Sequence, residues 1–419
     1  MSPGVTRTIP RVYTGVHRHT ASPGLFRPSF VGVLALAFLG FGLEGVIRTA
    51  IPLIVLDRGG DAVWVGVIAA AAALPSVLFR PFIGRLVDNW RHDRLLQAGA
   101  LVAAVGSIAL LVPGLISLAV LRFAQGTGWA TFSVANHALM AKLAPPNRRG
   151  EASGYFMAMP AIATLVCPPA GVALYLAAGE MPPLALALGL GLGAFAVSLV
   201  IRIPPAEGPL PASVTTVGPS VSGTPPAAGG RSILEPSAIP ATLMVATFMA
   251  GHSLFVVFPP VYLAAVGVDL IVLAPYYLGY GLVMTVSQLL VGPASDRLGR
   301  PFAIRLGSAI AIAGFASALV LPGLVALVSA SLAYATAVSF VSPTLSALTI
   351  DRAPPGRLGA AMATYSLGYQ LATGASGIVW GAIIALVGFP WPFAVAIGLQ
   401  LVTIIVSIRT AAPARPVRG

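Results

Sequence analysis

The chain is built around long apolar runs, many of them about 20 residues long and nearly free of charge, which is the length a helix needs to cross a bilayer. Lipid offers backbone groups no hydrogen-bond partners, so such runs must form helices or closed barrel strands. The runs lack the period-two alternation of barrel strands. Of the 419 residues, 57% are hydrophobic and only 9% charged, too few charges for a water-soluble surface. We therefore predict an all-α membrane protein.

The runs predict twelve transmembrane helices in two pseudo-symmetric six-helix bundles. The predicted spans are 30–53, 63–83, 95–112, 115–142, 151–178, 182–203, 239–265, 271–291, 302–321, 323–350, 358–386 and 390–408. A stretch rich in Pro, Gly, Ser and Thr separates the sixth span from the seventh, as expected of a flexible linker. The predicted parts are an N-terminal arm 1–29, a bundle 30–203, a linker 204–238, a bundle 239–408 and a tail 409–419.

The net charge of +12 is explained by topology, so no nucleic-acid partner is expected. All 24 Lys and Arg residues except Arg48, Arg58 and Arg122 lie in alternate connections between spans or at their edges. Positively charged loops stay in the cytoplasm, which places the arm, the linker and both termini there. The predominance of arginine over lysine is typical of a GC-rich bacterial genome. We expect a multi-pass, monomeric protein of the bacterial cytoplasmic (inner) membrane, in contact with the lipid bilayer.

The two halves are related by an internal repeat. The segment 84–88 (GRLVD) recurs as 292–296 (GPASD), and the two aspartates are 208 residues apart, since 296 − 88 = 208. The segment 144–150 recurs as 353–359 at an offset of 209. The same offsets align Glu44 with His252 and Arg122 with Ser331. Duplicated apolar halves are a common design of membrane transporters, whose substrate site lies between the repeats.

Charges inside the predicted spans point to a functional site. A charge at the bilayer centre costs on the order of 3 kcal/mol, and only Glu44, Arg48 and Arg122 lie well inside spans. Glu44 lies about 21 Å along the first span, and Arg48 follows one turn later on the same face. The membrane interior favours the protonated carboxyl, whereas a nearby arginine favours the carboxylate. We predict that Glu44 is the coupling proton site; the alternatives are a static ion pair with Arg48 and direct contact with a cationic substrate.

Two further residues are candidates for proton coupling. An unperturbed imidazole titrates near neutral pH, so His252 is expected to share proton transfer with Glu44 or to bind substrate, unless it is only hydrogen-bonded to a neighbouring helix. Arg122 is aligned with Ser331 in the second half of the repeat. The repeated scaffold therefore does not require a charge at this position, which favours a functional role for Arg122. The weaker candidates for a substrate cavity are Gln125, Asn136, Tyr262, Tyr280, Gln288, Tyr334, Tyr365, Tyr369 and Gln370.

The repeated loops are candidate gates. An aspartate at the end of a helix can pair with an arginine or cap a neighbouring helix, and Asp88 and Asp296 occupy such positions. The contact would form when the two halves close on that side, although a solvated turn explains the same pattern. The predicted gating residues are Gly84, Asp88, Gly292, Asp296, Arg297 and Arg300.

These motifs resemble those of the major facilitator superfamily, especially its twelve-span drug:proton antiporters. The segment 292–300 is similar to the family's G-x-L-x-D-R-x-G-R loop, whereas the basic tail is displaced in the first-half copy. The segment 121–128 is similar to its R-x-x-Q-G-x-G motif, and this resemblance implies proton transfer by Arg122 with Gln125 as a helper. The segment 163–172 resembles the fifth-span motif of exporters through Pro168 and Gly171, where a helix bend is expected, although Val172 departs from it.

We therefore expect a secondary transporter, driven by the proton gradient without a cofactor, that exports small amphipathic or cationic molecules by alternating access. The alternatives are a proton symporter that imports a small metabolite and a non-transporting membrane sensor or scaffold. An enzyme is not expected, because the sequence has no P-loop signature and no nucleophile–base pair. One cysteine, Cys167, excludes an internal disulfide and a cysteine metal cluster, and no metal site is predicted.

Overall fold

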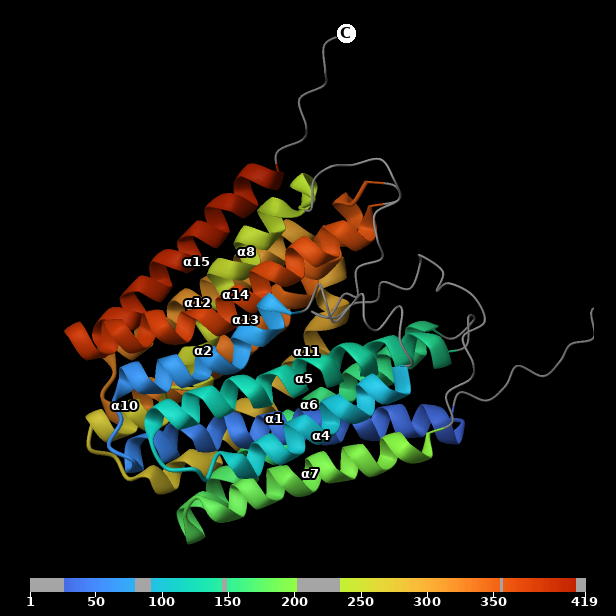
Figure 1. Ribbon diagram of the computed structural model, residues 1–419. Helices are drawn as coiled ribbons and strands as arrows, with labels where there is room; N and C mark the ends of the chain where they lie inside the picture. Colours follow the sequence, from blue (N-terminus) through green and yellow to red (C-terminus); the bar gives the residue numbers. More distant parts are fainter. Residues whose placement is uncertain (1–25, 80–91, 145–148, 202–233, 355–356, 412–419) are drawn as a thin grey trace, which may run out of the picture.

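The computed structural model describes residues 26–79, 92–144, 149–201, 234–354 and 357–411 (Figure 1). Within these ranges the regular secondary structure is helical throughout, which confirms the predicted all-α class. The first bundle contains α1 (Pro28–Asp57), α2 (Ala62–Leu78), α4 (His92–Ala109), α5 (Leu115–Leu143), α6 (Arg149–Ala178) and α7 (Met181–Val200). We call it the N bundle.

The C bundle begins with three short helices: α8 (Ile239–Met249), α9 (His252–Val256) and α10 (Pro259–Ala265). It continues with α11 (Leu273–Leu298), α12 (Arg300–Val320), α13 (Gly323–Arg352), α14 (Leu358–Val387) and α15 (Pro390–Ala411). The 3₁₀ turns η2 (Pro236–Ala238) and η3 (Leu270–Val272) precede α8 and α11. In the described ranges, nine helical segments are long and apolar enough to cross a bilayer, and α2 is a shorter apolar helix. The remaining N-bundle helices, α4 and α5, pack side by side in the same bundle.

The seventh predicted span is not the continuous helix that the sequence pattern indicated. It is broken after Met249 and again after Val256, and the three pieces are α8, α9 and α10. Gly251 lies at the first break, where a methyl group would collide with the ring of Phe315. Pro259 and Pro260 lie just after the second break and have no backbone N–H to continue the hydrogen-bond ladder.

Side chains from neighbouring helices satisfy backbone carbonyls at these breaks. The hydroxyls of Tyr276 and Tyr277 on α11 donate to the carbonyl oxygens of Phe255 and Val256, each at 2.9 Å. The indole of Trp380 on α14 donates to the carbonyl of Ala250 at 2.7 Å. A broken helix is tolerated at membrane depth where protein groups replace the lost backbone bonds. The breaks place His252 at the first residue of α9.

The bundles contact each other chiefly through α2 with α14 and α6 with α11. A methyl group on Gly66 of α2 would collide with the carbonyl oxygen of Gly377 on α14. Gly281 on α11 likewise packs against the backbone of Leu165 on α6. Small residues allow such close approach of membrane helices. Figure 1 shows the bundles inclined to each other, with α7 and α15 on opposite flanks.

Gly381 on α14 packs against the carbonyl oxygen of Ala62, the first residue of α2, directly after the turn 57–61. We call the end of the bundles at this turn the Arg58 end. Asp61 caps α2 by accepting a hydrogen bond from the backbone N–H of Trp64 at 3.0 Å. Arg58 forms an ion pair with Glu180 at 2.6 Å and donates to the carbonyls of Leu110 and Val112, each at 2.9 Å. One side chain therefore joins three connections of the N bundle at this end.

The described part of the predicted linker, 234–238, already packs on the C bundle. Glu235 is buried, caps η2, and forms an ion pair with Arg357 at 2.9 Å. Its backbone N–H donates to the hydroxyl of Thr364 on α14 at 2.9 Å. The rest of the linker lies outside the described residues.

Candidate functional site

A buried ion pair joins α1 to α5 inside the N bundle. Nη2 of Arg122 lies 2.8 Å from Oε1 of Glu44, and Nη1 lies 3.3 Å from Oε2. Glu44 is 6% exposed and Arg122 is 3% exposed. Two parallel N–H···O bonds fix the carboxylate in orientation as well as in position. The sequence offered both Arg48 and Arg122 as arginines near Glu44 but could not show that Arg122 is the closer one, because Arg122 lies 78 positions away with two predicted spans in between.

Gln125 completes the arrangement around Arg122. Its side-chain oxygen accepts a hydrogen bond from Nη1 of Arg122, one turn earlier on α5. Gln125 is fully buried, and Gly106 of α4 leaves room for its side chain. The Gln125 amide is therefore a second partner of the Arg122 guanidinium besides Glu44, and its role as a helper in proton transfer stays a prediction.

Arg48 is bound less tightly than Arg122. Its Nη2 lies 3.4 Å from Oε1 of Glu44, and its side chain is 41% exposed. The predicted pair of Glu44 and Arg48 at positions i and i+4 is therefore present but long. Glu44 is ion-paired to two arginines, of which Arg122 provides the closer and more buried contact.

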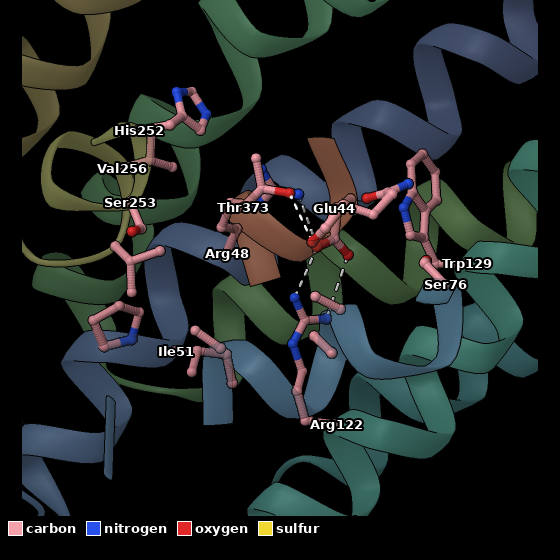
Figure 2. A pocket seen from close by; sticks show the side chains of 16 residues that line it. Glu44, Arg48, Ile51, Ser76, Arg122, Trp129, His252, Ser253, Val256 and Thr373 are labelled. Atoms are coloured by element: carbon pink, nitrogen blue, oxygen red, sulfur yellow. Dashed lines mark hydrogen bonds and ion pairs between the residues drawn. The ribbon is translucent and has the colours of Figure 1, made fainter. Parts of the chain in front are cut away.

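These residues line a cavity of about 80 Å³ between the two bundles (Figure 2). Such a space holds several water molecules. From the N bundle the walls include Glu44, Arg48, Ser76, Arg122 and Trp129. From the C bundle they include His252, Ser253, Val256, Gln370 and Thr373.

His252 and Glu44 line the same cavity from opposite halves of the repeat. His252 is the first residue of α9, and its Nδ1 lies 3.4 Å from the hydroxyl of Tyr280 on α11. Its ring also lies 6.4 Å from that of Tyr334, centroid to centroid. Figure 2 shows the Arg122 guanidinium directed at the Glu44 carboxylate, with His252 set apart from this ion pair.

Most of the weaker cavity candidates lie elsewhere. Gln370 lines the cavity, whereas Gln125, Asn136, Tyr262, Tyr280, Gln288, Tyr334, Tyr365 and Tyr369 are not among its lining residues. Three of the tyrosine hydroxyls bind backbone carbonyls: Tyr334 that of Phe248 at 2.8 Å, Tyr262 that of Gly323 at 3.1 Å, and Tyr365 that of Ser342 at 3.3 Å. Their role in this structure is to join helices of the C bundle.

The gating prediction lies mostly outside the described residues. Gly84 and Asp88 are not described, and neither are the side chains at Gly292, Asp296 and Arg297 on α11. Arg300, at the start of α12, forms an ion pair with Asp351 at the end of α13, with 2.6 Å between Nη1 and Oδ2. Both side chains are partly exposed. Because α12 and α13 both belong to the C bundle, this ion pair links two helices of one bundle and does not join the two bundles.

Pro168 and Gly171 pack α6 against α1 next to the ion pair. Gly45 of α1 contacts the ring of Pro168, and Thr49 donates to its carbonyl at 3.4 Å. Gly171 lies against Val46, where a larger residue would push the helices apart. The helix α6 continues through Pro160, Pro168 and Pro169 without a break.

Sequence reasoning missed several lining residues. Trp129 follows Arg122 by seven positions and therefore shares its helix face, which is a signal that helical periodicity offers. Thr373 follows Gln370 by three positions and therefore also shares its helix face. Ser76 and Ser253 carry no comparable signal, because a serine in a membrane helix most often bonds its own backbone.

Two inclined helical bundles around a polar, charged cavity are an arrangement typical of membrane transporters. A family comparison agrees: the model of the Major Facilitator Superfamily matches residues 33–377 and 278–418. The chain belongs to this superfamily of transporters, which agrees with the prediction that it is not an enzyme.

Solved structures share the fold at low sequence identity. The nucleoside transporter NupG superposes with a TM-score of 0.70 and 14% identity, over 91% of this chain and all of that one. The human organic anion transporter TETRAN gives a TM-score of 0.66 and 18% identity, over 91% of this chain and 99% of that one. At these identities the likeness establishes the fold alone.

Curated relatives match over a shorter stretch. The vesicular acetylcholine transporter of Drosophila melanogaster is 34% identical over 151 residues, which are 35% of this chain and 26% of that protein. The staphylopine export protein of Staphylococcus aureus is 23% identical over 146 residues, which are 35% of this chain and 37% of that protein. The matches thus span only 26% and 37% of the length of these two relatives.

Proposed function

We propose that this protein is a proton-coupled secondary transporter that works by alternating access, with Glu44 as the coupling proton site. The observation that carries the proposal is the position of Glu44: a carboxylate buried in the cavity between the bundles and ion-paired to Arg122. An ionisable group inside the membrane is costly and marks a proton or substrate pathway.

Protonation of Glu44 is the proposed switch. The neutral carboxyl keeps hydrogen bonds but loses its charge attraction to Arg122 and Arg48. The contact between α1 and α5 then weakens, while Gln125 still holds the Arg122 side chain. A change in this contact alters how α1 and α5 pack around the cavity. We propose that the altered packing shifts the equilibrium between the conformation open to the cytoplasm and the one open to the opposite side, as proton coupling requires.

Orientation follows from the charge distribution. We place the protein in the bacterial cytoplasmic membrane with both termini in the cytoplasm, so that the Arg58 end faces outward. The glycine contacts of α2 with α14 lie toward the Arg58 end. Closure on that side corresponds to a state in which the cavity is reached from the cytoplasm.

Export of small amphipathic molecules in exchange for protons is the first proposed direction. Support comes from the packing of Pro168 and Gly171 against α1, at the positions that resemble the exporter motif. The partial likeness to a staphylopine export protein points the same way. The gradient supplies the energy, no cofactor is needed, and we expect the monomer to be the working unit.

Import by proton symport is the second candidate, and the charge balance of the site favours it. Protonation of Glu44 would leave Arg48 and Arg122 without an anionic partner. An acidic substrate and a proton would then bind together, which is the linkage that cotransport requires.

Transport in everted membrane vesicles tests the proposal. A panel of amphipathic anions, cations and neutral compounds is added under an imposed pH gradient, and proton movement is followed with a pH-sensitive dye. Substrate-induced proton release from acid-loaded vesicles indicates exchange, and proton entry together with the substrate indicates symport. Transport of a panel compound without any associated proton movement, in wild-type vesicles, would remove proton coupling from the account.

A further inference from the structure

The charge of the cavity indicates which substrates it can accept. Among its described lining residues, the formally charged side chains are Glu44, Arg48 and Arg122. One carboxylate faces two guanidinium groups, so the cavity carries an excess positive charge even with Glu44 ionised. A cavity of one sign concentrates ligands of the opposite sign.

Arg48 is the cationic group with unused binding capacity. Arg122 is 3% exposed and has both terminal nitrogens bound to Glu44 or Gln125. Arg48 has its side chain 41% exposed, and its contact with Glu44 is 3.4 Å long. Arg48 lines the cavity together with His252 and Gln370 of the C bundle.

The rest of the wall suits a ligand that is part polar and part apolar. Gln370 and Thr373 of α14 supply neutral hydrogen-bonding groups. Ile51, Val256 and Trp129 supply apolar surface. A planar guanidinium beside such a wall matches the geometry of a carboxylate on an apolar body.

We infer that the cavity binds small organic anions, with the Arg48 guanidinium pairing with the carboxylate of the ligand. The inference rests on the proposal that this cavity is the substrate site, but not on proton coupling or on the direction of transport. It narrows the sequence-based expectation of amphipathic or cationic substrates to amphipathic anions.

Glu44 is then a competitor of the ligand for the same arginine. Replacing Glu44 with glutamine removes the negative charge and leaves two guanidinium groups facing the cavity. An anion should bind more tightly to that variant, whereas a cation that used Glu44 as its partner should bind more weakly. The sign of this single change separates the two classes of ligand.

The test uses the purified full-length protein in detergent and a matched set of probes: benzoate, benzylammonium, benzyl alcohol and inorganic phosphate. Each affinity is obtained from the dependence of the unfolding temperature on probe concentration, with the probe-free temperature of each variant as its own baseline. The proteins are wild type, Glu44→Gln, Arg48→Met and Arg48→Lys, with Arg305→Met as a control arginine outside the cavity.

We expect benzoate to bind wild type more tightly than the other three probes do. We also expect Arg48→Met to weaken benzoate binding about tenfold or more, Arg48→Lys to restore part of it, and Arg305→Met to leave it unchanged. Glu44→Gln should strengthen it. Tighter binding of benzylammonium than of benzoate, no benzoate response, or a benzoate response unaffected by Arg48→Met would overturn the inference. Phosphate binding as tight as benzoate would show a site for inorganic anions instead. All of these results are independent of the proton-flux measurement.

Discussion

Arg122 on α5 binds both carboxylate oxygens of Glu44 on α1, at 2.8 and 3.3 Å, inside the N bundle. The C bundle has no equivalent of this pair, since the repeat-related residues are Ser331 and His252. Ser331 is buried and donates to the carbonyl of Val328 within its own helix. The two bundles therefore share a scaffold, whereas the charged side chains among the described cavity-lining residues, Glu44, Arg48 and Arg122, belong to the N bundle.

The first prediction concerns the stability of this pair. Arg122→Met leaves the carboxylate of Glu44 buried with only the long contact to Arg48, and we expect a loss of about 3–5 kcal/mol in the free energy of unfolding. The double variant Glu44→Gln/Arg122→Met removes both charges and should recover much of that loss. Thermal unfolding of these two variants and of Glu44→Gln alone, each compared with wild type, measures the coupling between the two residues. Additive effects of the two substitutions would contradict a direct ion pair.

A second prediction concerns the contact between the bundles. Gly66→Val places a branched side chain against the backbone of Gly377, and overpacking of this kind costs about 1–3 kcal/mol. Because the cost falls on the state in which the two helices touch, we expect the transport rate to fall about tenfold, the protein remaining folded. Gly189→Val on α7 is the matched control, since a methyl group there has no neighbouring atoms within 4 Å. Equal transport rates in the two variants would show that this contact does not open or close during transport.

A third prediction separates stability from transport. Arg58→Met breaks the ion pair with Glu180 and two hydrogen bonds to the carbonyls of Leu110 and Val112. We expect a loss of about 1–3 kcal/mol, seen as a lower unfolding temperature, with an unchanged transport rate well below that temperature. The exposed Arg27 provides the control, and Arg27→Met should unfold like wild type. A transport defect in the Arg58 variant at low temperature would give this residue a role beyond tying the loops together.

Much of the fold could be predicted from the sequence, because span length, apolar content and an internal repeat are local properties of the chain. The break in the seventh span could not. It depends on Gly251 meeting Phe315 and on hydroxyls from Tyr276 and Tyr277, which are contacts between helices. An apolar segment that contains Gly and Pro has the same sequence pattern whether the helix is continuous or broken, so the pattern cannot predict the break.

The candidate site was partly predictable for the same reason. Glu44, Arg48, Arg122 and His252 stand out as polar groups in apolar surroundings, and all four line the cavity. Their partners do not stand out, because the pairing of Glu44 with Arg122 depends on how α1 packs on α5. The hydrogen bonds of the tyrosine candidates could not be predicted for a related reason: several of their hydroxyls bind backbone carbonyls within the C bundle, and such contacts leave no pattern along the chain.

The central claim is that Glu44 couples transport to protons. The measurement that tests it most directly compares wild type with Glu44→Gln in proteoliposomes, using one panel compound that wild type transports. Two rates are taken: exchange of labelled for unlabelled compound at equal pH, and net accumulation driven by an imposed pH gradient. The account predicts that Glu44→Gln keeps the exchange but loses the gradient-driven accumulation. Accumulation by Glu44→Gln with the same dependence on the pH gradient as wild type would contradict it.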